Sequence, residues 1–225
     1  MRISRATIDV PDATTAAAFY ETVLGLPVES EPGGAVVLVG TTALVLRENQ
    51  QTRGVHHLAF TIPSNKFDAA KRWISARVSL MSKGGEDEFE YGAGWNARSF
   101  YFAGPNDTVL EIIIRRDLAN AADGDFGSDD LLCISEVGVA VPDVLGTVGM
   151  LGAQADVTPY GLPPRERFTP VGDIDGLVIL VAPDRTWFPA EDRLSSESRI
   201  LIDAVGDRPG IFALGSESVL SIRRE

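Results

Sequence analysis

The chain has 225 residues, and its content of 44% apolar and 23% charged residues is enough to bury a core, which argues against a disordered protein. A net charge of −12 with scattered basic residues argues against nucleic-acid binding and against an anionic membrane surface. No apolar run approaches the ~20 residues that span a bilayer. With no secretory signal and the single cysteine Cys133, we expect a cytoplasmic protein without disulfides.

A strand pattern that ends in proline occurs three times along the chain. The copies cover residues 5–11, 57–63 and 136–142, and in each the apolar residues alternate. Alternation with a period of two is typical of a strand with one buried face. Proline ends such a strand because it cannot donate to the hydrogen-bond ladder. The repeat therefore predicts three modules that begin in the same way.

An amphipathic helix is predicted after each of these strands, and each has a candidate N-cap directly after the proline. The predicted helices cover residues 16–24, 67–78 and 144–151, and the candidate caps are Asp12, Ser64 and Asp143. Three glycines weaken the helical pattern of the third.

Further strands are predicted after each helix, separated by Gly-, Pro- and Asn-rich turns. They cover residues 27–31, 35–40 and 43–47, then 89–91, 97–102 and 108–114, and then 168–171 and 176–181. Terminal strands are expected over 199–205 and 211–223, and these lack the repeated motif. The polar segment 119–130, rich in Gly and Asp, is predicted to be a linker.

The sequence thus predicts an α+β protein built from repeated βαβββ modules that form cupped, mixed β-sheets. One complete module pair is expected over residues 1–118, from modules 1–50 and 54–118. A degenerate second pair is expected over residues 131–225.

Several motifs within these modules carry a resemblance to a known family. They are Phe19-Tyr20 with Leu24-Gly25-Leu26, the run from His57 to Phe60, and Ser99 to Phe102 leading through Gly104-Pro105-Asn106-Asp107 to Glu111. The pattern resembles the vicinal oxygen chelate superfamily, which includes glyoxalase I, bleomycin-resistance proteins, methylmalonyl-CoA epimerase and extradiol dioxygenases. The likeness covers residues 3–116 well and 134–183 more weakly.

The resemblance implies a divalent metal site inside a cup formed by two modules. Ligands in that superfamily come from the first and last strands of each module, which correspond here to Arg5, His57 and Glu111. His57 and Glu111 are the implied ligands of Fe, Mn, Zn or Ni. Arg5 has no lone pair to give, so the site is incomplete, and Arg5 is expected to pair with Glu111 or to bind a substrate carboxylate. Glu136 holds the first-strand position of the third module.

Two aromatic residues join this implied site. Tyr101 precedes Glu111 by ten residues, the spacing of the extradiol enzymes, which suggests catalytic roles for Tyr101 and Glu111. Trp95 follows Gly92 and Gly94 and is expected to cover a bound ligand. The alternatives are that both aromatics only pack, that His57 is hydrogen-bonded in a pocket or paired with Glu111, and that a salt bridge between Glu111 and Arg5 closes an empty cup. His56, the other of the two histidines, is expected on the opposite face as a surface or packing residue.

Two functions remain open at this point. The first is an enzyme, a metal-dependent lyase, isomerase or dioxygenase that acts on a small oxygenated organic molecule in the cup with His57 and Glu111. The alternative is a metal-free protein that sequesters a small molecule, as bleomycin-resistance proteins do. A purely structural or regulatory role is a third idea, and a homodimer through exposed sheet edges is expected in either of the first two cases.

Overall fold

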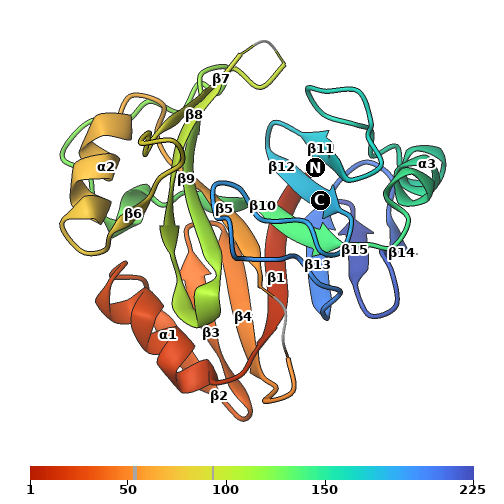
Figure 1. The fold of residues 1–225 in the computed structure, drawn as a ribbon, viewed down its shortest axis with the longest axis horizontal. Helices are drawn as coiled ribbons and strands as arrows, with labels where there is room; N and C mark the ends of the chain where they lie inside the picture. The colour runs from red at the N-terminus through yellow and green to blue at the C-terminus, as the bar shows by residue number, and fades with distance from the viewer. Residues whose placement is uncertain (53–54, 93) are drawn as a thin grey trace.

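The structure, a computed structural model, describes residues 1–52, 55–92 and 94–225. Within these residues the chain forms two mixed β-sheets and three α-helices (Figure 1). None of the described helices has both the length and the apolar character needed to cross a membrane. The two chain ends lie near each other, and Arg2 forms an ion pair of 2.7 Å with Glu225.

The first sheet has seven strands and contains both ends of the chain. In spatial order its strands are β14 (Gly210–Ala213), β15 (Val219–Arg223), β13 (Ile200–Val205), β1 (Arg2–Val10), β4 (Thr42–Glu48), β3 (Gly34–Val39) and β2 (Val28–Glu31). The edge strands are β14 and β2. The homodimer through such edges stays a prediction.

The second sheet is built from the middle of the chain. In spatial order its strands are β11 (Phe168–Asp173), β12 (Gly176–Val181), β10 (Cys133–Ala140), β5 (His57–Thr61), β9 (Val109–Arg115), β8 (Ala97–Ala103) and β6 (Leu80–Met81), with β7 (Phe89–Tyr91) also paired to β8. Short 3-10 turns lie at Pro105–Asp107 and Ser128–Asp130.

The modules pair in an order that the local sequence pattern does not reveal. The second and third modules share the second sheet, where β5 runs antiparallel to β10. The first module shares its sheet with the terminal strands, where β1 runs antiparallel to β13. In the terminal segment β15 is parallel to β13 and antiparallel to β14, just as β4 is parallel to β1 and antiparallel to β3. The terminal strands therefore form a reduced fourth module without a helix.

Three α-helices follow the first strands of the modules as predicted, with shifted ends. They are α1 (Ala13–Thr22), α2 (Phe67–Ser75) and α3 (Val144–Ala155). The Asp12 and Asp143 carboxylates accept hydrogen bonds from Thr15 N and Gly146 N, so both predicted N-caps are confirmed. The predicted cap Ser64 is wrong, because α2 begins after Lys66. The Ser64 backbone N–H instead donates to the Asn120 side chain at 3.0 Å.

One continuous hydrophobic core joins the two sheets and the three helices. It includes Ile8 and Ile202 from the first sheet and Phe60 and Val139 from the second. The segment between the predicted domains is attached to this body, because Lys66 forms an ion pair of 2.8 Å with Asp130. The division into units 1–118 and 131–225 stays a prediction, while the hydrogen-bonded ladders extend across it.

Candidate metal and ligand site

Strand β9 turns two kinds of side chain to opposite faces of the second sheet. Leu110, Ile112 and Ile114 point into the shared core. Glu111 lies on the other face, which lines a cavity, and we call this the cup face. The alternation explains how one acidic residue can interrupt an apolar run without entering the core.

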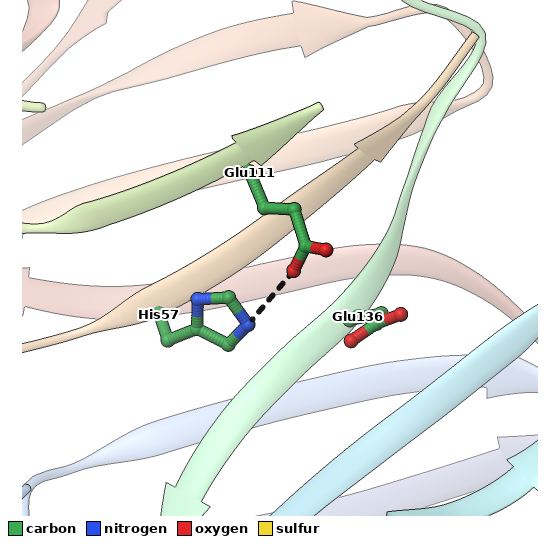
Figure 2. Close-up of side chains that lie close together, drawn as sticks. All are labelled: His57, Glu111 and Glu136. Carbon is green, nitrogen blue, oxygen red and sulfur yellow. Dashed lines mark ion pairs between the residues drawn. The ribbon is translucent and has the colours of Figure 1, made fainter. Parts of the chain in front are cut away.

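Neighbouring strands place further polar residues on the same face. On β5 His57 lies on the cup face, while Leu58 and Phe60 face the core. On β10 the pairing register shifts between Ile134 and Glu136, which is a β-bulge. A bulge re-aims side chains and bends the strand. Glu136 therefore reaches the cup face beside His57 and Glu111, as Figure 2 shows.

His57 presents a lone pair to Glu111. The His57 Nδ1 lies 3.1 Å from the backbone oxygen of Val109, and a carbonyl can only accept, so Nδ1 carries the proton. Nε2 of the neutral ring then has a lone pair that can accept a proton or bind a metal ion. It lies 3.5 Å from Glu111 Oε2, and both side chains are buried (Figure 2).

Arg115 occupies the end of β9 and neutralises Glu136. Its guanidinium is fully buried and forms an ion pair with the Glu136 carboxylate. It also donates to Thr61 Oγ1 at 3.1 Å and to Ser135 Oγ at 3.0 Å. Because β5 and β10 supply these acceptors and Arg115 belongs to β9, this side chain connects three strands beneath the cup.

Burial governs the protonation of the site. It lowers the pKa of His57 to about 4, against the effect of the hydrogen bond to Val109. Burial, followed by the charge of Glu136, raises the pKa of Glu111 to about 8. Burial also raises the pKa of Glu136, and the contact with Arg115 opposes this rise. Near pH 7 the site thus favours a neutral imidazole and a protonated Glu111.

The stability of the metal-free protein is expected to fall between pH 6.5 and 8. The folded state holds the Glu111 proton more tightly than the unfolded state, whose pKa is near 4.5, so stability decreases as pH rises through this range. The slope from one such group is at most about 1.4 kcal/mol per pH unit. The lowered pKa of His57 affects stability only below pH 6.5. There it has the opposite effect, so that stability increases as pH rises from about 4 to 6.5.

Urea unfolding in the presence of a chelator measures this slope. Glu111→Gln should remove the slope contributed by Glu111, and the difference between the two proteins cancels other groups, including the amino terminus. Equal slopes for wild type and variant would contradict the prediction.

A cavity of about 430 Å³ opens above these residues. Aromatic side chains form much of its wall, and part of that wall comes from the segment of residues 182–195, which we call the strap. The cavity is lined by His57, Glu90, Tyr91, Gly92, Trp95, Tyr101, Glu111, Glu136, Leu162, Phe168, Ile179, Arg185, Trp187 and Phe188. A volume of this size is typical of small-molecule sites.

The strap holds Trp187 against His57. The two rings stack with centroids 5.2 Å apart, and Trp187 Nε1 donates to the Val55 oxygen at 2.9 Å. Gly138 on β10 makes room for this indole, since a Cβ there would lie 2.4 Å from Trp187 Cη2 and 3.0 Å from His57 Cβ. The glycine is thus required by the close approach of the strap.

Gly138→Ala is expected to displace Trp187 and to destabilise the protein by about 1–3 kcal/mol, because Trp187 and His57 leave no space for the added methyl group. Near-UV circular dichroism and urea unfolding measure both effects. The double variant Gly138→Ala with Trp187→Phe removes the outer ring atoms and should recover part of the loss. An unchanged Trp187 signal in the single variant would refute the explanation.

The structure brings together all but one of the residues predicted for the site. His57, Glu111, Tyr101 and Trp95 line one cavity, and Glu136 joins them. Arg5 does not, because β1 belongs to the other sheet. Its exposed guanidinium lies 4.0 Å from Asp203, so the expected pair with Glu111 is not formed. His56 is buried on the other face, with Nε2 2.8 Å from the Asp9 backbone oxygen, as a packing residue.

Sequence reasoning missed several residues of this site. Arg115 lies four residues after Glu111, and the period of two along β9 could have placed it on the same face. Arg185, Trp187 and Phe188 lie in the irregular strap, where no periodic signal exists. Their place over the cup follows only from the three-dimensional fold.

Comparison with solved structures identifies the architecture. No protein-family model matches the sequence, and neither does any curated protein sequence. A protein from Bacillus subtilis subsp. subtilis str. 168, provisionally named as a dioxygenase, matches 92% of this chain and 71% of its own, with a TM-score of 0.58 and 15% identity. This match confirms the predicted fold of repeated modules.

Shorter structures match about half of the chain. A glyoxalase/bleomycin resistance protein/dioxygenase from Nocardioides covers 56% of this chain and 90% of its own, with a TM-score of 0.41 and 25% identity. A lactoylglutathione lyase from Agrobacterium tumefaciens covers 50% of this chain and 92% of its own, with a TM-score of 0.43 and 18% identity.

Proposed function

We propose that this chain, which has the fold of the vicinal oxygen chelate superfamily, binds a divalent metal ion in the cup and acts there on a small oxygenated organic molecule. The observation that carries the proposal is the cluster of His57, Glu111 and Glu136. One ligand atom from each lies within 4.8 Å of the others, and all three residues are buried. Three protein ligands with an open position are characteristic of catalytic metal sites.

The geometry of His57 and Glu111 fits such an ion. In a tetrahedral site with bonds of about 2.1 Å, two donor atoms are about 3.4 Å apart. Nε2 and Oε2 are 3.5 Å apart. The other His57 nitrogen donates to a backbone carbonyl, which is how metal-binding histidines are usually oriented. Imidazole with two carboxylates suits Fe, Mn, Zn or Ni.

The charge of the site supports the same proposal. Glu111 and Glu136 are buried side by side, and Arg115 pairs with Glu136. The raised pKa of Glu111 reflects a carboxylate without a direct cationic partner among the described residues. A bound dication would favour the ionised form of Glu111 and supply the missing positive charge.

The remaining residues of the cup shape the reaction space. A bound divalent ion would supply Lewis acidity toward a substrate oxygen. The Tyr101 hydroxyl lies 2.7 Å from the Tyr91 hydroxyl, and the backbone of Tyr101 is paired with that of Glu111 in the β8–β9 ladder. We assign Tyr101 to hydrogen bonding of the substrate and Glu111 to proton transfer or metal binding. Trp187 and Phe188 exclude water from this side of the cup.

A second candidate is metal-free binding of a small molecule. The observation that favours it is the ion pair between Arg115 and Glu136, since the guanidinium already satisfies one of the three ligands. In this case the same cavity would sequester its ligand without turnover.

Metal analysis of protein purified without chelator tests the first proposal. The expected result is about one divalent ion per chain, retained on gel filtration, and its loss in His57→Ala and in Glu111→Gln. His56→Gln is the matched control, because His56 is the neighbouring histidine on the opposite face. Absence of metal in the wild type would favour the metal-free binder, and full retention in His57→Ala would contradict the proposed ligand set.

A further inference from the structure

Arg185 stands on the strap at the wall of the cavity, and its backbone is fixed there. Ser195 Oγ accepts from Arg185 N at 3.1 Å, and Ser195 N donates to the Arg185 oxygen at 2.8 Å. The Ser195 hydroxyl also donates to the Ala182 oxygen at 2.9 Å. These bonds hold the half-buried Arg185 side chain toward the cavity that it lines.

Arg185 has no ion-pair partner among the residues that the structure describes. Two of the acidic residues of the cavity wall have arginine partners: Glu136 pairs with Arg115, and Glu90 pairs with Arg98 and Arg116. The third, Glu111, lies beside His57. Burial and the nearby charge of Arg167 lower the pKa of Arg185. A half-buried cation that faces a second cation is costly unless an anion arrives to bind it.

The guanidinium has donors left for such an anion. It lies 4.7 Å from the centroid of the Phe168 ring, and Nη1 donates to the Thr186 oxygen at 3.1 Å. An arginine has five N–H donors, so most of them remain available. A planar guanidinium binds a carboxylate through two parallel hydrogen bonds, which a lysine cannot do.

The cavity that Arg185 shares with the cluster of His57, Glu111 and Glu136 has several aromatic side chains in its wall. Phe188 lies edge-to-face with both Tyr101 and Phe89, with centroids 5.5 and 4.6 Å apart. Trp187 offers a flat surface beside them, stacked on His57. Benzene fits an engineered cavity of about 150 Å³. The cavity of about 430 Å³ therefore has room for one substituted ring.

We propose that the cavity selects a single-ring aromatic carboxylate, with the carboxylate on Arg185, the ring against Trp187 and Phe188, and the opposite, oxygenated end toward His57 and Glu111. The assignment rests on the proposed function, whose substrate class it names. Arg185 is the specificity-determining residue of this arrangement. The cluster and Arg185 both line this cavity.

Calorimetric titration with 4-hydroxybenzoate and with its methyl ester tests this assignment. Both probes offer the same ring and hydroxyl, and the ester lacks the negative charge. Wild-type protein should bind the acid at least tenfold more tightly than the ester, because charge-assisted hydrogen bonds are lost in the ester. In Arg185→Gln the preference should fall to about twofold or less, through weaker binding of the acid alone.

Two further variants separate recognition from folding. Arg193→Gln changes another strap arginine, which pairs with Asp107 at 3.6 Å, and it should keep the wild-type preference. Arg185→Lys keeps the charge without the planar fork and should give an intermediate preference. Thermal unfolding identifies any variant that fails to fold, and Arg185→Lys then serves in place of Arg185→Gln.

Each titration is made twice, once with protein treated with a chelator and once with Mn²⁺ added. The metal content of the protein is measured in parallel. A preference for the acid that depends on Arg185 supports the substrate class, even if no metal binds and the metal proposal fails. Bound metal with equal affinity for acid and ester overturns the substrate class and leaves the metal proposal standing. An acid preference that survives in Arg185→Gln also overturns the role of Arg185.

Discussion

Arg115→Met is expected to lower the free energy of unfolding by about 3–5 kcal/mol, the typical cost of leaving one member of a buried ion pair alone. Arg115 is fully buried and satisfies Glu136, Thr61 and Ser135. Methionine cannot donate to any of them, so a buried carboxylate and two hydroxyls lose a partner. Urea unfolding at pH 7 measures the loss.

A matched pair of variants identifies the ion pair as the cause. Arg115→Met combined with Glu136→Met removes both charges and should recover much of the stability, since apolar replacements of a buried pair are often tolerated. Arg116→Met changes the next residue, whose guanidinium pairs with Glu90 at the surface, and should cost about 1 kcal/mol or less. If Arg115→Met stays within 1 kcal/mol of wild type, the pair has no such role.

Divalent metal is expected to stabilise the wild-type protein by about 2.7 kcal/mol when the free ion is at one hundred times its dissociation constant. The reason is that His57, Glu111 and Glu136 are assembled only in the folded state. Unfolding in urea with increasing Mn²⁺ or Zn²⁺ measures the gain. The gain should increase with pH up to about 8, because the ion competes with the proton on Glu111.

Glu111→Gln should lose most of this metal-dependent gain while it folds normally. Glu90→Gln is the matched control, because Glu90 lines the same cavity but pairs with surface arginines. Equal stabilisation of wild type and Glu111→Gln would place the ion elsewhere on this acidic chain.

Local sequence pattern was sufficient to predict the modules. Proline-ended strands and alternating apolar residues predicted β1, β5 and β10, and the helices after them, because both depend on neighbouring residues. The partner of each module was not predictable in this way. Arg5 and His57 hold equivalent places in two similar strands, and only the long-range pairing of β1 with β13 separates them.

Some residues of the candidate site were likewise predictable from the local sequence pattern, and others were not. His57 and Glu111 could be predicted from their places in a repeated motif, and Glu136 from the third copy. Arg185 and Trp187 could not, because the strap has no periodicity and its position depends on how the sheet beneath it packs. Trp187 is held by Val55, 132 residues earlier in the chain.

The pairing of β1 with β13 has a consequence for how the protein folds. Arg2 is paired with Val205, so the second edge of β1 stays uncovered until β13, which lies far along the chain, has formed. Contacts between residues so distant in sequence slow folding, because the chain must close a long loop before it gains their energy. An unpaired strand edge is also a site for association with other chains. The protein is therefore expected to fold slowly and to be prone to association with other chains while the edge of β1 is open.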